Sequence, residues 1–118
     1  MNKIEHIGIA VKDLEASNEL FTKLYGKPPY KSEAVESEGV TTSFFKVGPN
    51  KIELLEGTNS DSPITKFIAK KGEGIHHIAY DVTDIYSEIK RLKREGFTVL
   101  NETPKNGADN KLVAFLHP

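Results

Sequence analysis

The sequence predicts an α+β fold made of two tandem βαβββ modules, on three observations. The opening segment KIEHIGIAV returns in altered form as GEGIHHIAYDV at residues 72–82. Each copy is followed by an aspartate and by apolar residues at helical spacing, which is the pattern of a capped amphipathic helix. Short extended runs separated by turn residues follow the first helical segment. An internal repeat of this kind indicates a duplicated structural unit.

The repeat places a histidine at one position of both copies. His6 aligns with His77 at an offset of 71 residues (77 minus 6), and Asp13 aligns with Asp84. Each half of a 118-residue chain is too small to bury a core alone, so the halves are expected to share one. We predict a single domain with module one at 1–57, a linker with a short helix at 58–72, and module two at 73–118.

The composition narrows the classes of function. The 16 basic and 17 acidic side chains are spread along the chain, which argues against nucleic acid or an anionic membrane as a partner. The absence of cysteine rules out a thiolate metal site, a disulfide framework and a cysteine nucleophile. No apolar run approaches the roughly 18 residues of a membrane span. We therefore expect a cytoplasmic protein whose metal ligands, if any, are nitrogen and oxygen.

Module one reads as strand, helix and three strands. Ile4 to Val11 alternates as a strand does, Asp13 offers a helix N-cap, and Gly26 followed by two prolines ends the helix. Three extended runs are then expected, at 30–36, 40–47 and 51–56, with a tight turn at Gly48-Pro49-Asn50.

Module two begins in the same way after the linker. Ser62 followed by Pro63 starts a short linker helix. A strand at 75–82, a helix capped by Asp84 and ended by Gly96, strands at 97–100 and 112–117, and a mobile loop at 101–110 are then expected. A final strand matching 51–56 is expected after Pro118, and it is absent from this sequence.

The paired histidines are the strongest chemical signal. A single histidine on an apolar strand is usually structural, but recurrence at equivalent positions among small neighbours fits divalent-metal binding by His6 and His77. Glu53 is the third candidate, because a carboxylate among large apolar residues is costly to bury without a cation. The alternative is an edge-strand glutamate that faces water, as expected for Glu56. His76 is expected to project to the opposite strand face, as a structural residue or a support for the ligands.

Four segments carry a resemblance to a known family: HIGIAVKDLE, KIELLE, DSPITKFIAKKGEGIHHIAYDV and KLVAFLHP. They resemble the methylmalonyl-CoA epimerases of the vicinal oxygen chelate superfamily, which also contains glyoxalase I and the extradiol dioxygenases. The likeness covers essentially the whole chain. It implies two βαβββ modules whose curved sheets form a half-open cup around a divalent metal, in a homodimer.

The resemblance also implies a ligand set. His6, His77 and Glu53 match three metal ligands of the family, and the fourth is a glutamate in the closing strand, beyond Pro118. The expected ion is Co²⁺, with Zn²⁺, Mn²⁺ or Ni²⁺ as alternatives. An acid that some members carry in the third strand falls at Thr42, with Glu38 nearby, so these two are the catalytic candidates.

The implied activity is the interconversion of (2R)- and (2S)-methylmalonyl-CoA. This reaction removes a weakly acidic α-proton and returns it on the other face, so it needs a Lewis acid and two proton carriers. Without the fourth ligand, an impaired enzyme is expected. The alternatives are a glyoxalase-like lyase or isomerase, a non-catalytic small-ligand binding protein of the same superfamily, and a small interaction domain without a metal.

Overall fold

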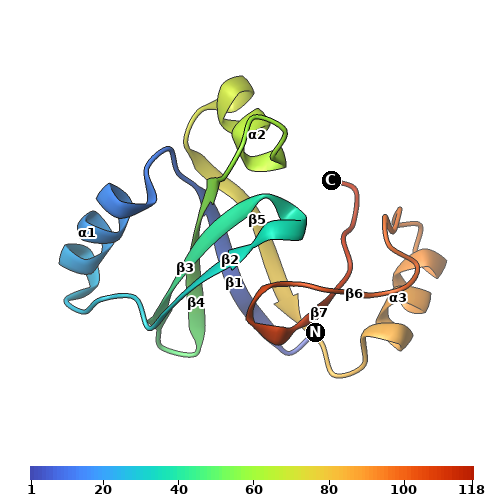
Figure 1. The fold of residues 1–118 in the computed structure, drawn as a ribbon. Helices are drawn as coiled ribbons and strands as arrows, with labels where there is room; N and C mark the ends of the chain where they lie inside the picture. The colour runs from blue at the N-terminus through green and yellow to red at the C-terminus, as the bar shows by residue number, and fades with distance from the viewer. The chain divides into compact units, whose positions relative to one another are not determined.

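A computed structural model describes residues 1–118, the side chain of Asp109 excepted. The chain separates into two compact units, which are described one at a time: Lys3–Tyr80, and Asp81–Pro118 together with Met1–Asn2. The order of elements along the chain confirms the predicted α+β class (Figure 1).

The unit Lys3–Tyr80 contains a five-stranded mixed sheet in the order β2-β3-β4-β1-β5. β1 pairs with β4 in parallel, while β4 with β3 and β3 with β2 are antiparallel. The β1-α1-β2-β3-β4 sequence is the predicted βαβββ module. The strands are β1 (Lys3–Ala10), β2 (Lys31–Val35), β3 (Val40–Val47), β4 (Asn50–Gly57) and β5 (Gly74–Asp81), with a 3₁₀ turn η1 (Glu36–Glu38).

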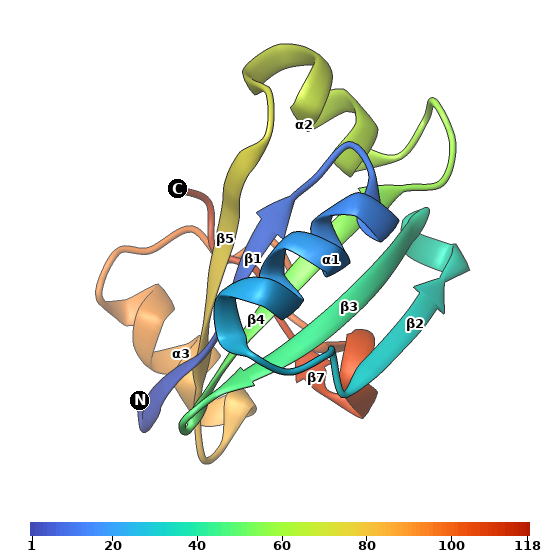
Figure 2. The same ribbon diagram turned by 90° about the vertical axis from the view of Figure 1, so that its left-hand side faces the viewer.

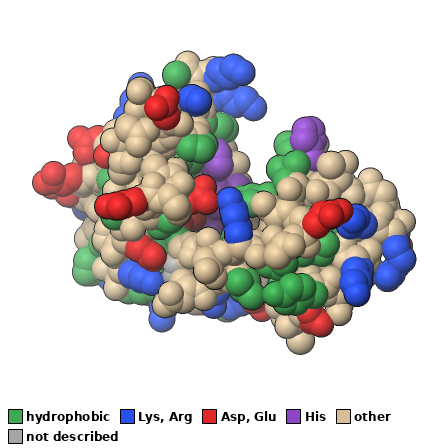
Figure 3. Space-filling view, turned by 45° about the vertical axis from the view of Figure 1, so that its right-hand side comes forward, with side chains coloured by type: hydrophobic (Ala, Val, Ile, Leu, Met, Phe, Trp, Pro, Cys, Tyr) green, Lys and Arg blue, Asp and Glu red, His purple; other side chains and the backbone are tan. Residues whose placement is uncertain are grey.

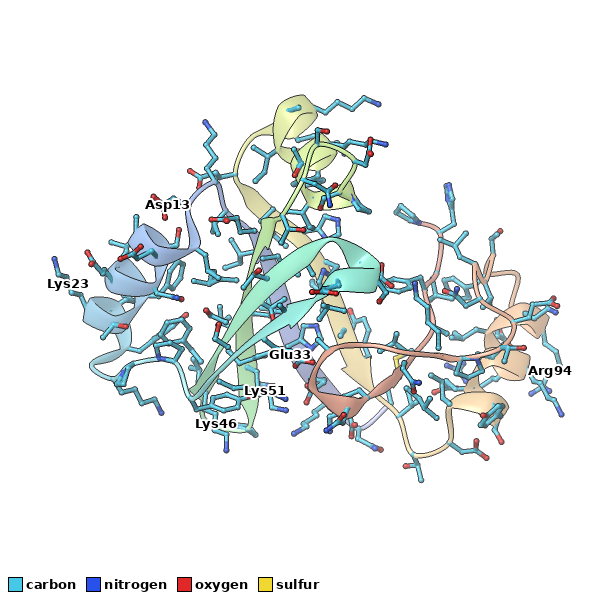
Figure 4. All side chains as sticks on the ribbon, viewed as in Figure 1. Asp13, Lys23, Glu33, Lys46, Lys51 and Arg94 are labelled. Carbon is cyan, nitrogen blue, oxygen red and sulfur yellow. The ribbon has the colours of Figure 1, made fainter. Side chains whose placement is uncertain are left out.

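Both helices of this unit begin where the sequence predicts, and α1 also ends where it predicts. In α1 (Leu14–Tyr25), the carboxylate of Asp13 accepts from the amide of Ala16, and Gly26 ends the helix at φ 74°. Asp13 and Lys23 lie at opposite ends of α1, where their charges complement the helix dipole (Figure 4). In α2 (Pro63–Lys71), the hydroxyl of Ser62 accepts from the amide of Ile64.

The two faces of the sheet are covered by different helices, because adjacent residues of a strand point to opposite sides. Leu54 and Phe45 pack beneath α1, which crosses the strands in Figure 2. Leu55 and Val40 pack on the other face with Ile64 of α2. The four-residue run at 52–55 is therefore apolar on both faces of the strand except at Glu53.

The unit Asp81–Pro118 begins with a capped helix, as module one does after its first strand, and then departs from that module. Asp84 caps α3 (Ile85–Arg94) by accepting from the amides of Tyr86 and Ser87. Two short strands, β6 (Lys105–Asn106) and β7 (Leu112–Val113), pair antiparallel, and a 3₁₀ turn η2 (Ala108–Asn110) lies between them.

Three predictions for this unit were wrong. The expected strand at 97–100 is a single bridge between Val99 and Leu116, and the strand expected at 112–117 ends at Val113. The segments still exchange hydrogen bonds, from the amide of Leu100 to Phe115 and from His117 to Thr98. These contacts are not continuous along the two segments, so the segments do not form a regular strand pair. The expected loop at 101–110 contains β6 and η2.

Charge is mixed over the surface. Figure 3 shows both basic and acidic side chains on the visible face. Among the described helices, none is long and apolar enough to cross a membrane.

Candidate metal centre

The sheet topology brings the three predicted ligands together from three adjacent strands. β1 lies between β4 and β5, so His6, Glu53 and His77 come from neighbouring strands of one sheet. Gly8 lies two residues after His6, so the two positions share one face of β1. Gly8 is also the register partner of Glu53 in β4. All three side chains belong to the unit Lys3–Tyr80.

The donor atoms form a small triangle. The Nε2 atoms of His6 and His77 are 3.0 Å apart, and the Oε1 atom of Glu53 lies 3.3 Å from the first and 3.4 Å from the second. The imidazole planes are nearly perpendicular, at 86°. Both rings therefore present Nε2 to one point.

Glu53 is the buried member of this group, with only 3 % of its surface exposed. Burial would raise the pKa of the Glu53 carboxyl, but hydrogen bonds from His6 and His77, and the positive charge of these rings when protonated, outweigh it. The pKa is lowered to about 2. The carboxylate is thus ionised at neutral pH. Because it is buried, the site must supply a positive charge to balance it.

The backbone leaves room for the His77 ring at Gly8. A Cβ atom at this position would lie 2.2 Å from Cε1 and 2.6 Å from Nδ1 of His77, which is too close for any side chain. The glycine is therefore required by the imidazole of the neighbouring strand rather than by backbone conformation. The equivalent residue in the repeat is Ala79, at the same offset of 71 (79 minus 8).

Nδ1 of His6 faces Glu5. The Oε1 atom of Glu5 lies 3.5 Å from this nitrogen, and Nζ of Lys51 lies 3.3 Å from the same oxygen. Burial lowers the pKa of His6, but the hydrogen bonds and charges of Glu53, and then of Glu5, outweigh it and raise the pKa. Sequence reasoning missed both Glu5 and Lys51.

Nδ1 of His77 faces His76, which corrects the expected orientation of that residue. The two Nδ1 atoms are 2.9 Å apart, so the rings do not point away from each other as regular strand alternation predicts. His76 packs edge-on against Phe67 of α2, 4.8 Å between ring centroids, on the site side of the sheet. Burial, and then the charge of His77, lower the pKa of His76, and Glu53 partly offsets this.

The donor set fits a divalent cation. Three lone-pair atoms turned toward one point repel one another unless protons or a cation lie among them. Ligand atoms at about 2.1 Å from an ion, separated by right or tetrahedral angles, lie about 3.0–3.4 Å apart. The observed separations of 3.0, 3.3 and 3.4 Å agree with this range. Two imidazoles and one carboxylate suit zinc, cobalt, nickel or manganese.

The other acidic and hydroxyl candidates are not part of the donor triangle. Thr42 is fully buried, on the sheet face that carries Leu55, and its hydroxyl donates to the carbonyl of Glu33. Glu38 is in η1 and is partly buried. Glu56 does not simply face water, as was expected: it is partly buried, and its Oε1 atom accepts from the amide of Leu14, 2.6 Å away.

Comparison with protein families shows which family the chain belongs to. Residues 5–115 match the family described as the glyoxalase, bleomycin resistance protein and dioxygenase superfamily. Since this match covers nearly the whole chain, the protein belongs to that superfamily, as the resemblance predicted.

Individual relatives narrow the comparison to epimerases. The chain is 40 % identical to the ethylmalonyl-CoA/methylmalonyl-CoA epimerase of Cereibacter sphaeroides, over 100 % of this chain and 90 % of that one. It is 38 % identical to the mitochondrial methylmalonyl-CoA epimerase of Dictyostelium discoideum, over 100 % and 72 %. A solved methylmalonyl-CoA epimerase in complex with methylmalonyl-CoA and NH₄⁺ superimposes with a TM-score of 0.94 at 35 % identity, over 100 % and 86 %.

Proposed function

We propose that the protein is a methylmalonyl-CoA epimerase that uses a divalent metal bound by His6, Glu53 and His77. The observation that carries this proposal is the triangle of two Nε2 atoms and one buried carboxylate oxygen. The epimerase relatives, which match over the full length of this chain, support the choice of substrate.

The ligand charges suit an anionic substrate. Two neutral imidazoles and one carboxylate contribute a single negative charge, so one positive charge of a divalent ion remains for the substrate. A metal at this place supplies Lewis-acid stabilisation of the negative charge that develops when the α-proton leaves. The imidazole rings, fixed by the contacts of their Nδ1 atoms, hold the ligand triangle in place.

The proton carriers remain a proposal on sequence grounds, with Glu38 and Thr42 as candidates. The Thr42 hydroxyl lies within the sheet and donates to a backbone carbonyl, which leaves Glu38 as the candidate with a carboxylate. Co²⁺ is the proposed ion, since it accepts this mixed nitrogen and oxygen donor set. A homodimer is proposed on the family resemblance alone.

Deuterium exchange tests the function directly. The chain is loaded with Co²⁺ and incubated with methylmalonyl-CoA in D₂O, and NMR follows the loss of the α-proton signal. We expect exchange that requires the metal and is lost in Glu53→Gln, while Glu15→Gln, a distant loss of the same charge, behaves as wild type. A protein that binds both metal and acyl-CoA without exchange would instead be a non-catalytic binding member of the superfamily.

A further inference from the structure

His6 and His77 share a second feature besides their equivalent positions in the repeat. The residue that precedes each histidine contacts its Nδ1 atom: Glu5 contacts His6 at 3.5 Å, and His76 contacts His77 at 2.9 Å. Glu5 and His76 are themselves related by the offset of 71 residues (76 minus 5). In both copies of the repeat, the residue before the histidine is therefore its partner, but it is a carboxylate in the first copy and an imidazole in the second.

We infer that Glu5 and His76 are positioning residues that orient the two ligands, and that they make His6 the stronger electron donor of the pair. This inference rests on the proposed metal-binding function and deepens it. The repeat has produced two equivalent histidines, and the residues before them make these histidines unequal.

If both histidines direct their Nε2 lone pairs at a metal, each needs a partner at Nδ1. An imidazole that gives its Nε2 lone pair to a metal carries its hydrogen on Nδ1, and that hydrogen needs an acceptor. The carboxylate of Glu5 can only accept. The Nδ1 atom of His76 accepts when His76 is a neutral imidazole with its hydrogen on Nε2. The short contact with His76 then fixes the ring of His77, and the charge of Glu5 favours the orientation of His6 that turns its Nδ1 hydrogen toward Glu5 and Nε2 toward Glu53.

Each partner is itself held in place. Nζ of Lys51, the residue paired with His6 in the β1–β4 register, lies 3.3 Å from the carboxylate of Glu5. Lys51 projects from β4 beside the sheet in Figure 4. The ring of His76 is fixed edge-on against Phe67, with an angle of 83° between the planes.

The two partners act through different forces. The Glu5 contact is long for a hydrogen bond, so the negative charge of Glu5 is its main contribution, since Coulomb attraction falls only slowly with distance. This charge increases the basicity of His6. The His76 contact is short and uncharged, so its acceptor atom orients His77 without adding electron density of the same strength.

Matched variants separate the two forces. For Glu5, Glu5→Gln retains an acceptor oxygen and removes the charge, whereas Glu5→Met removes both. For His76, His76→Asn retains an acceptor near the Nδ1 position, whereas His76→Leu removes it. Glu15→Gln is the control for loss of a carboxylate. Dissociation constants for Co²⁺ and Zn²⁺ are measured by chelator competition, with thermal unfolding in EDTA to verify the fold.

We expect Glu5→Gln and Glu5→Met to weaken metal binding alike, by about tenfold or more, because both lose the charge. His76→Leu should weaken it similarly, and His76→Asn should stay within about threefold of wild type. In the Zn²⁺-loaded protein labelled with ¹⁵N-histidine, two rings should show a slowly exchanging Nδ1 hydrogen, and His76→Leu should abolish slow exchange for one.

The outcomes are distinguishable. Wild-type affinity in both Glu5→Met and His76→Leu overturns the positioning roles while leaving the metal site intact. Glu5→Gln with wild-type affinity overturns the role of the charge, and His76→Asn as weak as His76→Leu overturns the role of the acceptor. A wild-type chain that binds neither Co²⁺ nor Zn²⁺ overturns the proposed function itself, and this inference with it.

Discussion

The two halves of the chain begin alike and then diverge. Asp13 and Asp84 cap the helices that follow β1 and β5 with nearly the same backbone angles, φ -136° and -134°, each at ψ 104°. After the helix, the first half continues into three strands of five to eight residues, whereas the second continues into two strands of two residues.

Burial follows the same division. In the first half the long strands β3 and β4 bury Phe44, Phe45 and Leu54 almost completely. Among the described side chains of Asp81–Pro118, the buried apolar ones are Ile89 and Leu92 of α3, while Phe97, Leu100 and Phe115 are exposed. The strand and the helix that begin each half therefore depend on local signals. A core, in contrast, requires long strands that pair in register.

The largest expected effect contrasts two phenylalanines. Phe45 is fully buried against Phe21 and Tyr25, and Phe97 is 52 % exposed. We expect Phe45→Ala to cost about 3–5 kcal/mol of unfolding free energy, and Phe97→Ala to cost less than about 1 kcal/mol. Urea denaturation measures both. An equal cost would mean that Phe97 is covered in solution and that the second half has a core of its own.

Metal removal should act on one unit only. All three proposed ligands lie in Lys3–Tyr80, so bound metal stabilises that unit, by about 2.7 kcal/mol at a hundredfold excess over the dissociation constant. Hydrogen exchange with and without EDTA should show slower exchange in β1, β4 and β5 with metal, and little change in β6 and β7. Equal protection of β6 and β7 would show that metal binding is coupled to the second unit.

A third comparison uses equivalent positions of the repeat, Gly8 and Ala79. In Gly8→Ala, the added methyl meets the His77 ring and must displace it, so Co²⁺ affinity should fall by about tenfold or more. Ala79→Gly removes a methyl group without adding a clash, so the affinity should change by less than about threefold, with a stability loss of about 0.5–1 kcal/mol. Chelator competition and urea denaturation measure the two quantities. An unchanged affinity in Gly8→Ala would mean that His77 is not a ligand.

The sequence was sufficient where a single residue determines the local structure. The caps at Asp13, Ser62 and Asp84 and the helix end at Gly26 were predicted because each acts within one turn of the chain. The recurrence of His6 at His77 likewise pointed to one site before any contact was known, and the structure brings the two rings together.

Features that depend on contacts between distant residues were not predicted. The short strand β6 lies in the segment that was expected to be a loop, and it has no periodic signal of its own. His76 lies toward His77 because Phe67 of α2 fixes its ring, and strand alternation alone does not reveal this contact. Glu5 carried a detectable signal, since the same offset relates it to His76, but a glutamate next to a histidine suggests nothing until the direction of Nδ1 is known.

The smallest expected effect concerns the charge of the two helix caps. Asp84 accepts from two amides and from the Ser87 hydroxyl, whereas Asp13 accepts from one amide of α1. The hydrogen bond from the Ser87 hydroxyl, followed by that from the Ser87 amide, lowers the pKa of the Asp84 carboxyl. A carboxyl with a lowered folded-state pKa stabilises the fold above its unfolded-state pKa, and this contribution is lost as the pH falls through the folded-state pKa.

Asparagine is as good a cap residue as aspartate, so Asp84→Asn and Asp13→Asn remove the charge and retain a cap. Thermal unfolding at neutral pH should show a small loss of stability in Asp84→Asn and a smaller one in Asp13→Asn. The difference between Asp84→Asn and wild type should shrink below about pH 4, where the wild-type carboxyl begins to protonate in the unfolded chain. A difference that stays constant down to pH 2 would show that the Asp84 charge does not stabilise α3, and that the two caps are equivalent in energy as well as in backbone angle.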